Sequence, residues 1–598
     1  MNADNDHRLD VPRWDLTDLY ESAGDPGIFQ DLETVRAQAV EFRTTYRGRF
    51  IHHRVDPLQL LSALKAYEAI HEQGMGPFFF AFLQHAAQTR EPECLSLFQR
   101  IRETWKTISK DIRFFEHELM GLTAAGFEEL LRHPDLSPYR WFLMRLIRQR
   151  PHRLSESEEE ILDAHFSACR SSLTSFYDEF LGSLVFSIKI DHRLRRLHME
   201  EVAQLRCSPD GAIRRRAVHG SLQELSKHGT VFKHILNAVV ESHLQEKESR
   251  AYASVLQMNL VSDGLDEDVM ETLMDRVESH YPLARTYWGL KARRLGADRL
   301  AHEDLLAPTG GAHANIPFSE GRDLILACSK EIHPTICDYA RACFGAGRVD
   351  AQLRKGKRIG AFCESFAPSQ PPYVAISYGG TIRDLMILSH EMGHVIHYCM
   401  AAGKSYLNFR PPPILAETAA TFFEMLFCRY LMEQPAFADH QADILGTCVD
   451  DILVCIFRQH VLTRFEQSIY EVRGDHFLSE MEIGDLWWKK NRKLFGESVK
   501  MGREYRWGWT PIPHFIHHPF YCYSYIFGNM VSLWLFNRYQ QDSREALDAL
   551  FHLLRSGGAE APLDLLSRLG IDPTKDAFYE TAFECLNGLI HSLETLPS

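Results

Sequence analysis

The segment from Leu388 to His397 carries the residues best suited to chemistry. It contains His390, Glu391 and His394 in the order His-Glu-x-x-His. Apolar residues recur around them at spacings of three and four, which predicts a helix. Side chains four positions apart lie on one face of a helix, so His390 and His394 can bind one metal ion. Glu391 projects beside that pair, where it can act as a general base on water without being a ligand.

A surface helix that carries two histidines and a glutamate by chance would show the same short pattern. Two features favour the metal site. The helix has an apolar face formed by Leu385, Leu388, Met392 and Val395. Gly393 stands inside the helix although glycine costs ~1 kcal/mol there relative to alanine, which predicts close approach by a neighbouring element or a ligand.

A third metal ligand is expected on a second helix that begins near Ile414, after a run of three prolines that cannot continue a helix. Catalytic zinc sites usually combine three protein ligands with one water. Glu417 lies among small and apolar residues, where an isolated carboxylate is costly unless it is paired or bound to metal. We therefore predict Glu417 as the third ligand. Glu424, seven residues on, is either an acceptor for an imidazole N–H or a partly exposed helix residue.

The segment 507–525 combines aromatic residues with histidines. Its side chains include four that could donate a hydrogen bond to an oxyanion: His514, Tyr521, Tyr523 and Tyr525. The alternative is an aromatic core with His517 and His518 merely exposed.

A small sheet is expected directly before the His-Glu-x-x-His helix. Residues 360–362 and 373–378 are β-like and are bounded by proline and glycine pairs. An edge strand beside a metal can bind an extended peptide through main-chain hydrogen bonds. An ordinary buried hairpin would give the same pattern.

The rest of the chain is predicted to be mostly α-helical. Its 598 residues exceed one ordinary core, so two or more lobes or one large composite domain are expected. We divide the chain into an N-terminal helical lobe, 1–205, and a catalytic zinc peptidase region, 206–598. Residues 1–205 are expected to be helical throughout, with short polar breaks. Examples of predicted helices are 30–46, 56–73, 94–119, 156–184, 212–227, 230–248 and 266–279.

Composition excludes some partners and compartments. The 45% hydrophobic and 24% charged content is that of a soluble globular protein, and the net charge of −14 argues against a nucleic-acid binder. The 13 cysteines show no framework spacing. Met1–His7 lacks the basic and apolar regions of a signal peptide, and Phe78–Leu83 is too short to span a bilayer. These features predict a cytoplasmic protein without a membrane partner.

Several motifs together resemble one family of zinc metallopeptidases. The segments His390–His394, Ala416–Thr421, Ile512–Phe515 and Pro519–Tyr525 resemble the thimet oligopeptidase and oligoendopeptidase F family. The opening Trp14–Tyr20 resembles the start of the oligoendopeptidase F branch. The resemblance implies a mostly α, two-lobed enzyme with a deep substrate channel, a small β-sheet beside the zinc helix, and one Zn²⁺ ion. It also implies cleavage of short, unstructured peptides at internal bonds.

The resemblance also implies roles for individual residues. His390, His394 and Glu417 are the expected zinc ligands, and Glu391 is the expected base. In the expected mechanism, zinc polarises a bound water and the scissile carbonyl, and Glu391 moves the proton from water to the leaving amine. His514 and Tyr523 stabilise the oxyanion, with Tyr521 and Tyr525 as the other tyrosine candidates.

Two other functions are compatible with the zinc motif. A helical carboxypeptidase would need a cationic group for the terminal carboxylate of its substrate. A helical scaffold with a purely structural zinc would normally fill the fourth coordination position with protein.

Overall fold

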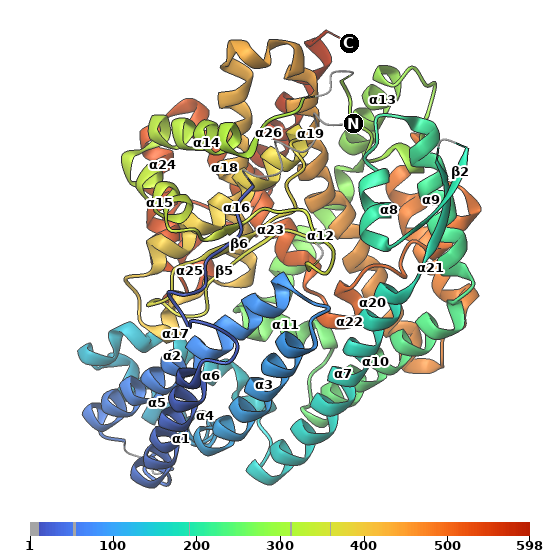
Figure 1. The fold of residues 1–598 in the computed structure, drawn as a ribbon. Coiled ribbons are helices and arrows are strands. Elements are labelled where there is room, and N and C mark those ends of the chain that lie inside the picture. Colours follow the sequence, from blue (N-terminus) through green and yellow to red (C-terminus); the bar gives the residue numbers. More distant parts are fainter. Residues whose placement is uncertain (1–10, 52–54, 191, 311–313, 359, 598) are drawn as a thin grey trace. The chain divides into compact units, whose positions relative to one another are not determined.

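The computed structural model describes residues 11–51, 55–190, 192–310, 314–358 and 360–597. Met1–His7, on which the absence of a signal peptide was predicted, lies outside these residues. The structure is mostly α-helical, as predicted, with a few short strands (Figure 1). Among the residues described, none of the helices is both long enough and apolar enough to cross a membrane.

The chain forms two compact units, and each is assembled from three separate stretches. The first unit comprises Met1–Arg153, His313–Tyr430 and Arg538–Ile571, and the second comprises Leu154–Ala312, Leu431–Asn537 and Asp572–Ser598. Neither unit is a continuous part of the chain, and none of their boundaries falls at residue 205. The division of function at that residue stays a prediction.

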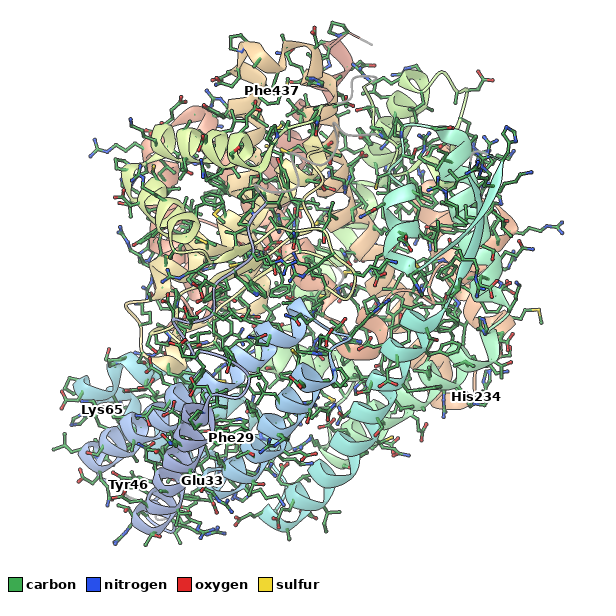
Figure 2. All side chains as sticks on the ribbon, in the orientation of Figure 1. Phe29, Glu33, Tyr46, Lys65, His234 and Phe437 are labelled. Carbon is green, nitrogen blue, oxygen red and sulfur yellow. The ribbon has the colours of Figure 1, made fainter. Side chains whose placement is uncertain are left out.

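The first unit begins with a helical bundle around an aromatic core. Its helices are α1 (Pro26–Tyr46), α2 (Pro57–Ala87), α3 (Pro92–Ile112), α4 (Phe114–Met120), α5 (Ala124–Arg132) and α6 (Arg140–Gln149), with the short η2 (Pro134–Tyr139) and η3 (Arg150–His152) between and after them. Figure 2 shows Phe29 and Tyr46 near the two ends of α1. Fully buried core residues of the bundle include Phe50, Phe79, Phe80, Phe114 and Phe115.

The same unit continues with the elements that surround the His-Glu-x-x-His segment. They are α14 (Phe318–Ile332), α15 (Pro334–Gly345), β4 (Val349–Asp350), β5 (Phe362–Glu364), β6 (Tyr373–Ala375), α16 (Ile382–Ala401), α17 (Tyr406–Phe409), α18 (Pro413–Glu433), α24 (Ser543–Ser556) and α25 (Pro562–Arg568). Helix α18 ends three residues into the second unit. The helix α16 packs against α15, α24 and the strands β5 and β6.

The predicted small sheet beside α16 is present. Strand β6 pairs with β5 antiparallel and with β4 parallel. Strand β4, only two residues long, was not predicted. Its Asp350 is fully buried and accepts hydrogen bonds from Arg354 (2.6 Å) and from Lys357 (2.9 Å). Lys357 also donates to the Ile376 carbonyl (2.7 Å). This lysine therefore connects the buried Asp350 to the chain just past β6.

The second unit is built from helices and two small strand pairs. Its elements are α7 (Glu156–Ser183), β1 (Phe186–Ile190), β2 (Arg193–Leu197), α8 (Met199–Leu205), α9 (Gly211–Ser226), α10 (Gly229–Ser249), α11 (Val255–Asp263), α12 (Glu267–Ser279), α13 (Tyr281–Arg294), β3 (Leu300–Ala301), η4 (His302–Asp304), η5 (Pro435–His440), α19 (Gln441–Leu453), η6 (Val454–Arg458), α20 (Gln459–Asp475), α21 (Glu480–Phe495), β7 (Val499–Lys500), η7 (Arg503–Trp507), α22 (His514–His517), α23 (Cys522–Gln541) and α26 (Asp576–Thr595). Helix α23 runs four residues past Asn537 into the first unit.

The expectation that residues 1–205 are helical throughout is wrong at the hairpin of β1 and β2. These strands pair in antiparallel register from Phe186↔Leu197 to Ile190↔Arg193. Residues of β1 alternate between buried and exposed, the period of a strand with one face on a core.

Candidate metal centre

The helix α16 is held at both its start and its apolar face. Thr381 and Asp384 form a reciprocal capping box at its N-terminus, which satisfies backbone N–H groups that a helix leaves unpaired. The predicted apolar face is buried, with Leu385, Leu388, Met392 and Val395 all fully inaccessible. This packing fixes the rotation of the helix, and therefore the direction in which His390 and His394 project.

Gly393 marks the place where α16 and α18 touch. A Cβ atom added there would clash with the Cα atom of Ala420 and lie 2.7 Å from the carbonyl oxygen of Ala419. Such contacts are far inside the normal carbon distances, so only glycine fits. The close approach of the two helices predicted from Gly393 is therefore present, and it brings Glu417 on α18 within reach of the histidines on α16.

The three predicted metal ligands converge. Oε2 of Glu417 lies 3.3 Å from Nε2 of His390 and 3.7 Å from Nε2 of His394. One ligand atom from each of the three residues lies within 4.8 Å of the others. Zinc–ligand bonds of roughly 2.0–2.2 Å at tetrahedral angles separate ligand atoms by roughly 3.4 Å. Two histidines and a carboxylate at these spacings are a donor set that zinc accepts.

Glu424 takes the position of an acceptor behind His390. Its Oε2 lies 3.0 Å from Nδ1 of His390 and accepts the hydrogen bond of that N–H group. A protonated Nδ1 leaves the lone pair of His390 on Nε2, the atom that faces Glu417. Of the two alternatives for Glu424, the structure gives the buried one, with 7% of the residue exposed.

Glu391 is a buried carboxylate beside this cluster. Only 5% of the residue is exposed, and its Oε2 has no hydrogen-bond partner among the described residues. Burial raises the pKa of the Glu391 carboxyl to about 8. A cation bound by the neighbouring ligands would favour the charged carboxylate and lower this pKa again.

The segment with His514 and the tyrosines lies in the second unit. The imidazole of His514 contacts two phenol rings, with ring centroids 6.3 Å from Tyr521 and 5.8 Å from Tyr525. Nε2 of His514 lies 3.4 Å from the Tyr525 hydroxyl. Burial lowers the pKa of His514 to about 4, so the imidazole is neutral at pH 7. His514, Tyr521 and Tyr525 therefore form one cluster.

Tyr523 does not join that cluster. It is 1% exposed, and its hydroxyl donates to Asp263 at 2.5 Å. Burial raises the pKa of Tyr523 well above its usual value. A phenol that already donates to the partly buried carboxylate of Asp263 does not support the expectation that Tyr523 meets the oxyanion. Tyr525 lies two positions after Tyr523 in α23, which puts these two side chains on opposite sides of the helix, and Tyr521 is the residue directly before α23.

One cluster of candidate ligands was missed by the sequence analysis. His219, His302 and Glu303 come together in the second unit. Their segments are far apart along the chain, and only the adjacent pair His302-Glu303 was visible as a local signal.

Comparison with known proteins agrees with this geometry. A family model described as peptidase family M3 matches residues 315–585, which include His390, Glu391, His394, Glu417 and His514. A second model, described as oligopeptidase F, matches residues 118–186.

Relatives match along the whole chain. The group B oligopeptidase PepB of Streptococcus agalactiae is 23% identical and covers 100% of this chain and 99% of its own length. An oligoendopeptidase F homolog of Lactococcus lactis subsp. lactis is 23% identical over 98% of this chain and 97% of its own. The crystal structure of oligoendopeptidase-F from Enterococcus faecium shares the fold, with a TM-score of 0.70, 22% identity, and coverage of 95% of this chain and 97% of that one. The chain belongs to peptidase family M3, in its oligoendopeptidase F branch.

Proposed function

We propose that this metalloendopeptidase is a zinc-dependent oligoendopeptidase that hydrolyses internal bonds of short, unstructured peptides. One observation carries the proposal. The ligand atoms of His390, His394 and Glu417 converge, and the buried carboxylate of Glu391 stands next to them with one oxygen unpartnered. A structural zinc site would use a fourth protein ligand, whereas a catalytic one leaves that position for water.

His390, His394 and Glu417 would hold one zinc ion, which would supply a Lewis acid that makes water a stronger acid. Glu391 accepts the proton of the attacking water and passes it to the leaving amine. Glu424 keeps the proton of His390 on Nδ1 and so orients the ring. The burial of Glu391 and Glu424 and the contact of Glu424 with His390 support these proposed roles.

We also propose that His514, with Tyr521 and Tyr525, donates hydrogen bonds to the oxyanion of the substrate. The support is the family resemblance of their segment and the mutual contacts of these three rings. Tyr523 is left out of this role because its hydroxyl already donates to Asp263.

We propose the cytoplasm as the compartment in which this protein acts. Its support is the sequence argument that 13 cysteines without framework spacing suit a reducing environment.

The substitution Glu391→Gln tests the function. It removes the base and keeps the size of the side chain, so the variant is expected to bind zinc as the unaltered chain does. Turnover of an internally quenched peptide should fall by about 10²–10⁴, the usual contribution of a general base. Glu417→Ala should lose both zinc and turnover, and Glu331→Gln, on the exposed surface of α14, serves as the control. Near-normal turnover by the Glu391→Gln variant would sink the proposal.

A further inference from the structure

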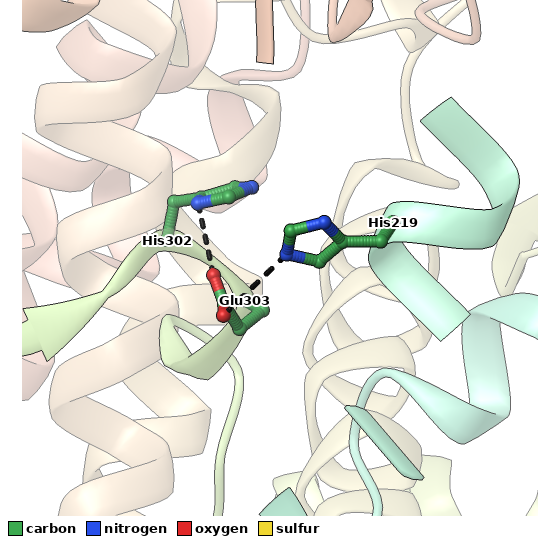
Figure 3. A group of neighbouring side chains, drawn as sticks. All are labelled: His219, His302 and Glu303. Atoms are coloured by element: carbon green, nitrogen blue, oxygen red, sulfur yellow. Dashed lines mark ion pairs between the residues drawn. The ribbon is translucent and has the colours of Figure 1, made fainter. Parts of the chain in front are cut away.

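A second group of side chains that could bind a metal lies in the second unit and shares no residue with the proposed peptidase site. His219 projects from α9, His302 and Glu303 belong to η4, and Glu504 belongs to η7. Figure 3 shows His219, His302 and Glu303 pointing toward one another. These three segments of the chain meet at the cluster, since α9 packs against both η4 and η7.

Each imidazole presents one nitrogen to each carboxylate. Glu303 lies 2.9 Å from Nδ1 of His302 and 3.6 Å from Nε2 of His219. Glu504 faces the opposite nitrogens, with its Oε1 3.2 Å from Nδ1 of His219 and 3.6 Å from Nε2 of His302. One ligand atom each from His219, His302 and Glu303 lies within 4.8 Å of the others.

Hydrogen bonds alone leave this cluster incomplete. His302 is 5% exposed, and neither its Nε2 nor Oε1 of Glu504 has a hydrogen-bond partner among the described residues. The amide of Gly502 donates to Nδ1 of His302 at 3.3 Å, which requires a lone pair on that nitrogen. The lone pair then faces a carboxylate oxygen of Glu303 only 2.9 Å away. Two acceptors in contact repel each other, and a cation that takes the Nδ1 lone pair in place of the Gly502 amide, and that binds Glu303 as well, removes the repulsion.

We propose that His219, His302 and Glu303 bind a second divalent transition-metal ion, with zinc as the favoured metal. Two imidazoles and a carboxylate suit zinc, and the nitrogen–oxygen spacings bracket the roughly 3.4 Å expected for ligands of one tetrahedral ion. With the ion bound, Nδ1 of His219 would carry its proton toward Oε1 of Glu504, 3.2 Å away, the arrangement that orients a histidine at a metal site.

Three protein ligands leave the fourth position of this ion open to water. The ion would link α9 to η4, which lie far apart in the sequence, and no residue of the peptidase mechanism takes part. Arg215 donates to Oε1 of Glu303 at 3.3 Å and stays as a neighbour of the bound carboxylate. Loss of this ion should therefore lower thermal stability and leave peptide hydrolysis by the folded enzyme intact.

Metal stoichiometry of the full chain tests the site. The protein is saturated with Zn²⁺, dialysed against metal-free buffer and analysed by inductively coupled plasma mass spectrometry. We expect two zinc ions per unaltered chain, and one per chain for His219→Ala and for Glu303→Gln, both with peptidase activity retained. His476→Ala is the matched control, because His476 also contacts a glutamate but belongs to no group of three candidate ligands among the described residues. The control should keep two ions.

Two results would overturn the proposal. One is a single zinc ion per unaltered chain, and the other is two ions retained by His219→Ala, which would mean that the extra zinc is adventitious. The zinc content of the unaltered chain tests the site even if a variant does not fold. The peptidase site is judged separately, because Glu417→Ala should lose the other ion together with activity. A variant that has lost activity but still binds one zinc ion separates the two sites, provided that adding His219→Ala to the same chain releases that ion.

Discussion

Glu424 is a positioning residue, because it contacts His390 and not the substrate. Alanine at position 424 would leave Nδ1 of His390 without its acceptor. Removing such a partner typically costs 10- to 100-fold in metal affinity, and we expect a loss of that size for Glu424→Ala. Glu424→Gln should recover part of it, since the amide oxygen can still accept from Nδ1–H. Chelator competition measures the affinity, and an unchanged affinity for Glu424→Ala would show that His390 needs no orientation from α18.

The tyrosines of the 521–525 segment should separate by function. Tyr521→Phe and Tyr525→Phe are expected to lower kcat much more than they change KM, by up to about 10²–10³ for the residue that meets the oxyanion. Tyr523→Phe should instead lower stability, because it removes a partly buried hydrogen bond to a carboxylate, a kind worth about 1.5–3 kcal/mol. Kinetics and thermal melts of the three variants, run together, provide the comparison. If neither Tyr521→Phe nor Tyr525→Phe alters kcat, the segment has no part in oxyanion binding.

For single residues, the sequence predicted most of the side-chain positions that depend on one helical turn. His390, His394 and Glu391 follow from the period of a single helix, and Glu417 follows from the cost of burying an unpaired carboxylate. The choice among the tyrosines required the hydrogen bond from Tyr523 to Asp263, which forms between segments far apart in the sequence. The cluster around His302 was not predictable, because its members meet only after distant segments have packed.

The contact between α16 and α18 depends on the absence of a side chain at Gly393. Gly393→Ala should force the helices apart and destabilise the protein by about 1–3 kcal/mol, the usual cost of overpacking. It should also weaken zinc binding, because Glu417 would move away from the histidines. Thermal melts and zinc titration measure the two effects.

Gly588→Ala provides the control for Gly393→Ala. Gly588 lies inside α26 with open space around the position of a Cβ, so alanine there should be neutral or stabilise by about 0.5–1 kcal/mol. If both variants behaved alike, helix propensity and not the close contact would explain the effect at Gly393.

Helix boundaries differed from the sequence predictions where packing outweighed local signals. Helix α2 runs to Ala87, well past the predicted end at residue 73, and has Pro77 inside it. The buried rings of Phe79 and Phe80 hold the later turns in the core, although proline removes a hydrogen bond there. Conversely, the predicted helix 94–119 is divided into α3 and α4 at Arg113.

The range of substrates should reflect how deeply the carboxylates of the proposed metal centre, Glu391 and Glu417, are buried in the first unit. Only 5% of Glu391 and 9% of Glu417 is exposed, so a peptide bond must enter as a free, extended strand to reach them. We expect cleavage of peptides of about ten residues, including those with an acetylated N-terminus and an amidated C-terminus, and no cleavage of a stably folded protein. Mass spectrometry of the products provides the measurement. Release of single C-terminal residues only from unblocked peptides would indicate a carboxypeptidase, and efficient digestion of the folded protein would contradict the size limit.

The mostly helical class and the small sheet were predictable for the whole molecule, because they follow from periodicity and from short β-like runs between turns. The composition of the two units was not. Stretches such as 1–153 and 538–571 belong together only through contacts that no local pattern records.

That interleaving of stretches has a consequence for synthesis on the ribosome. The stretch up to Arg153 emerges well before the last stretch of the same unit, Arg538–Ile571, which follows almost four hundred residues later. Its helix α24 packs directly on α16, so the growing chain carries an exposed apolar surface on α16 until α24 has been synthesised. Nascent chains that stall before Arg538 should therefore depend on chaperones, and they are expected to be digested by proteases that spare the finished protein.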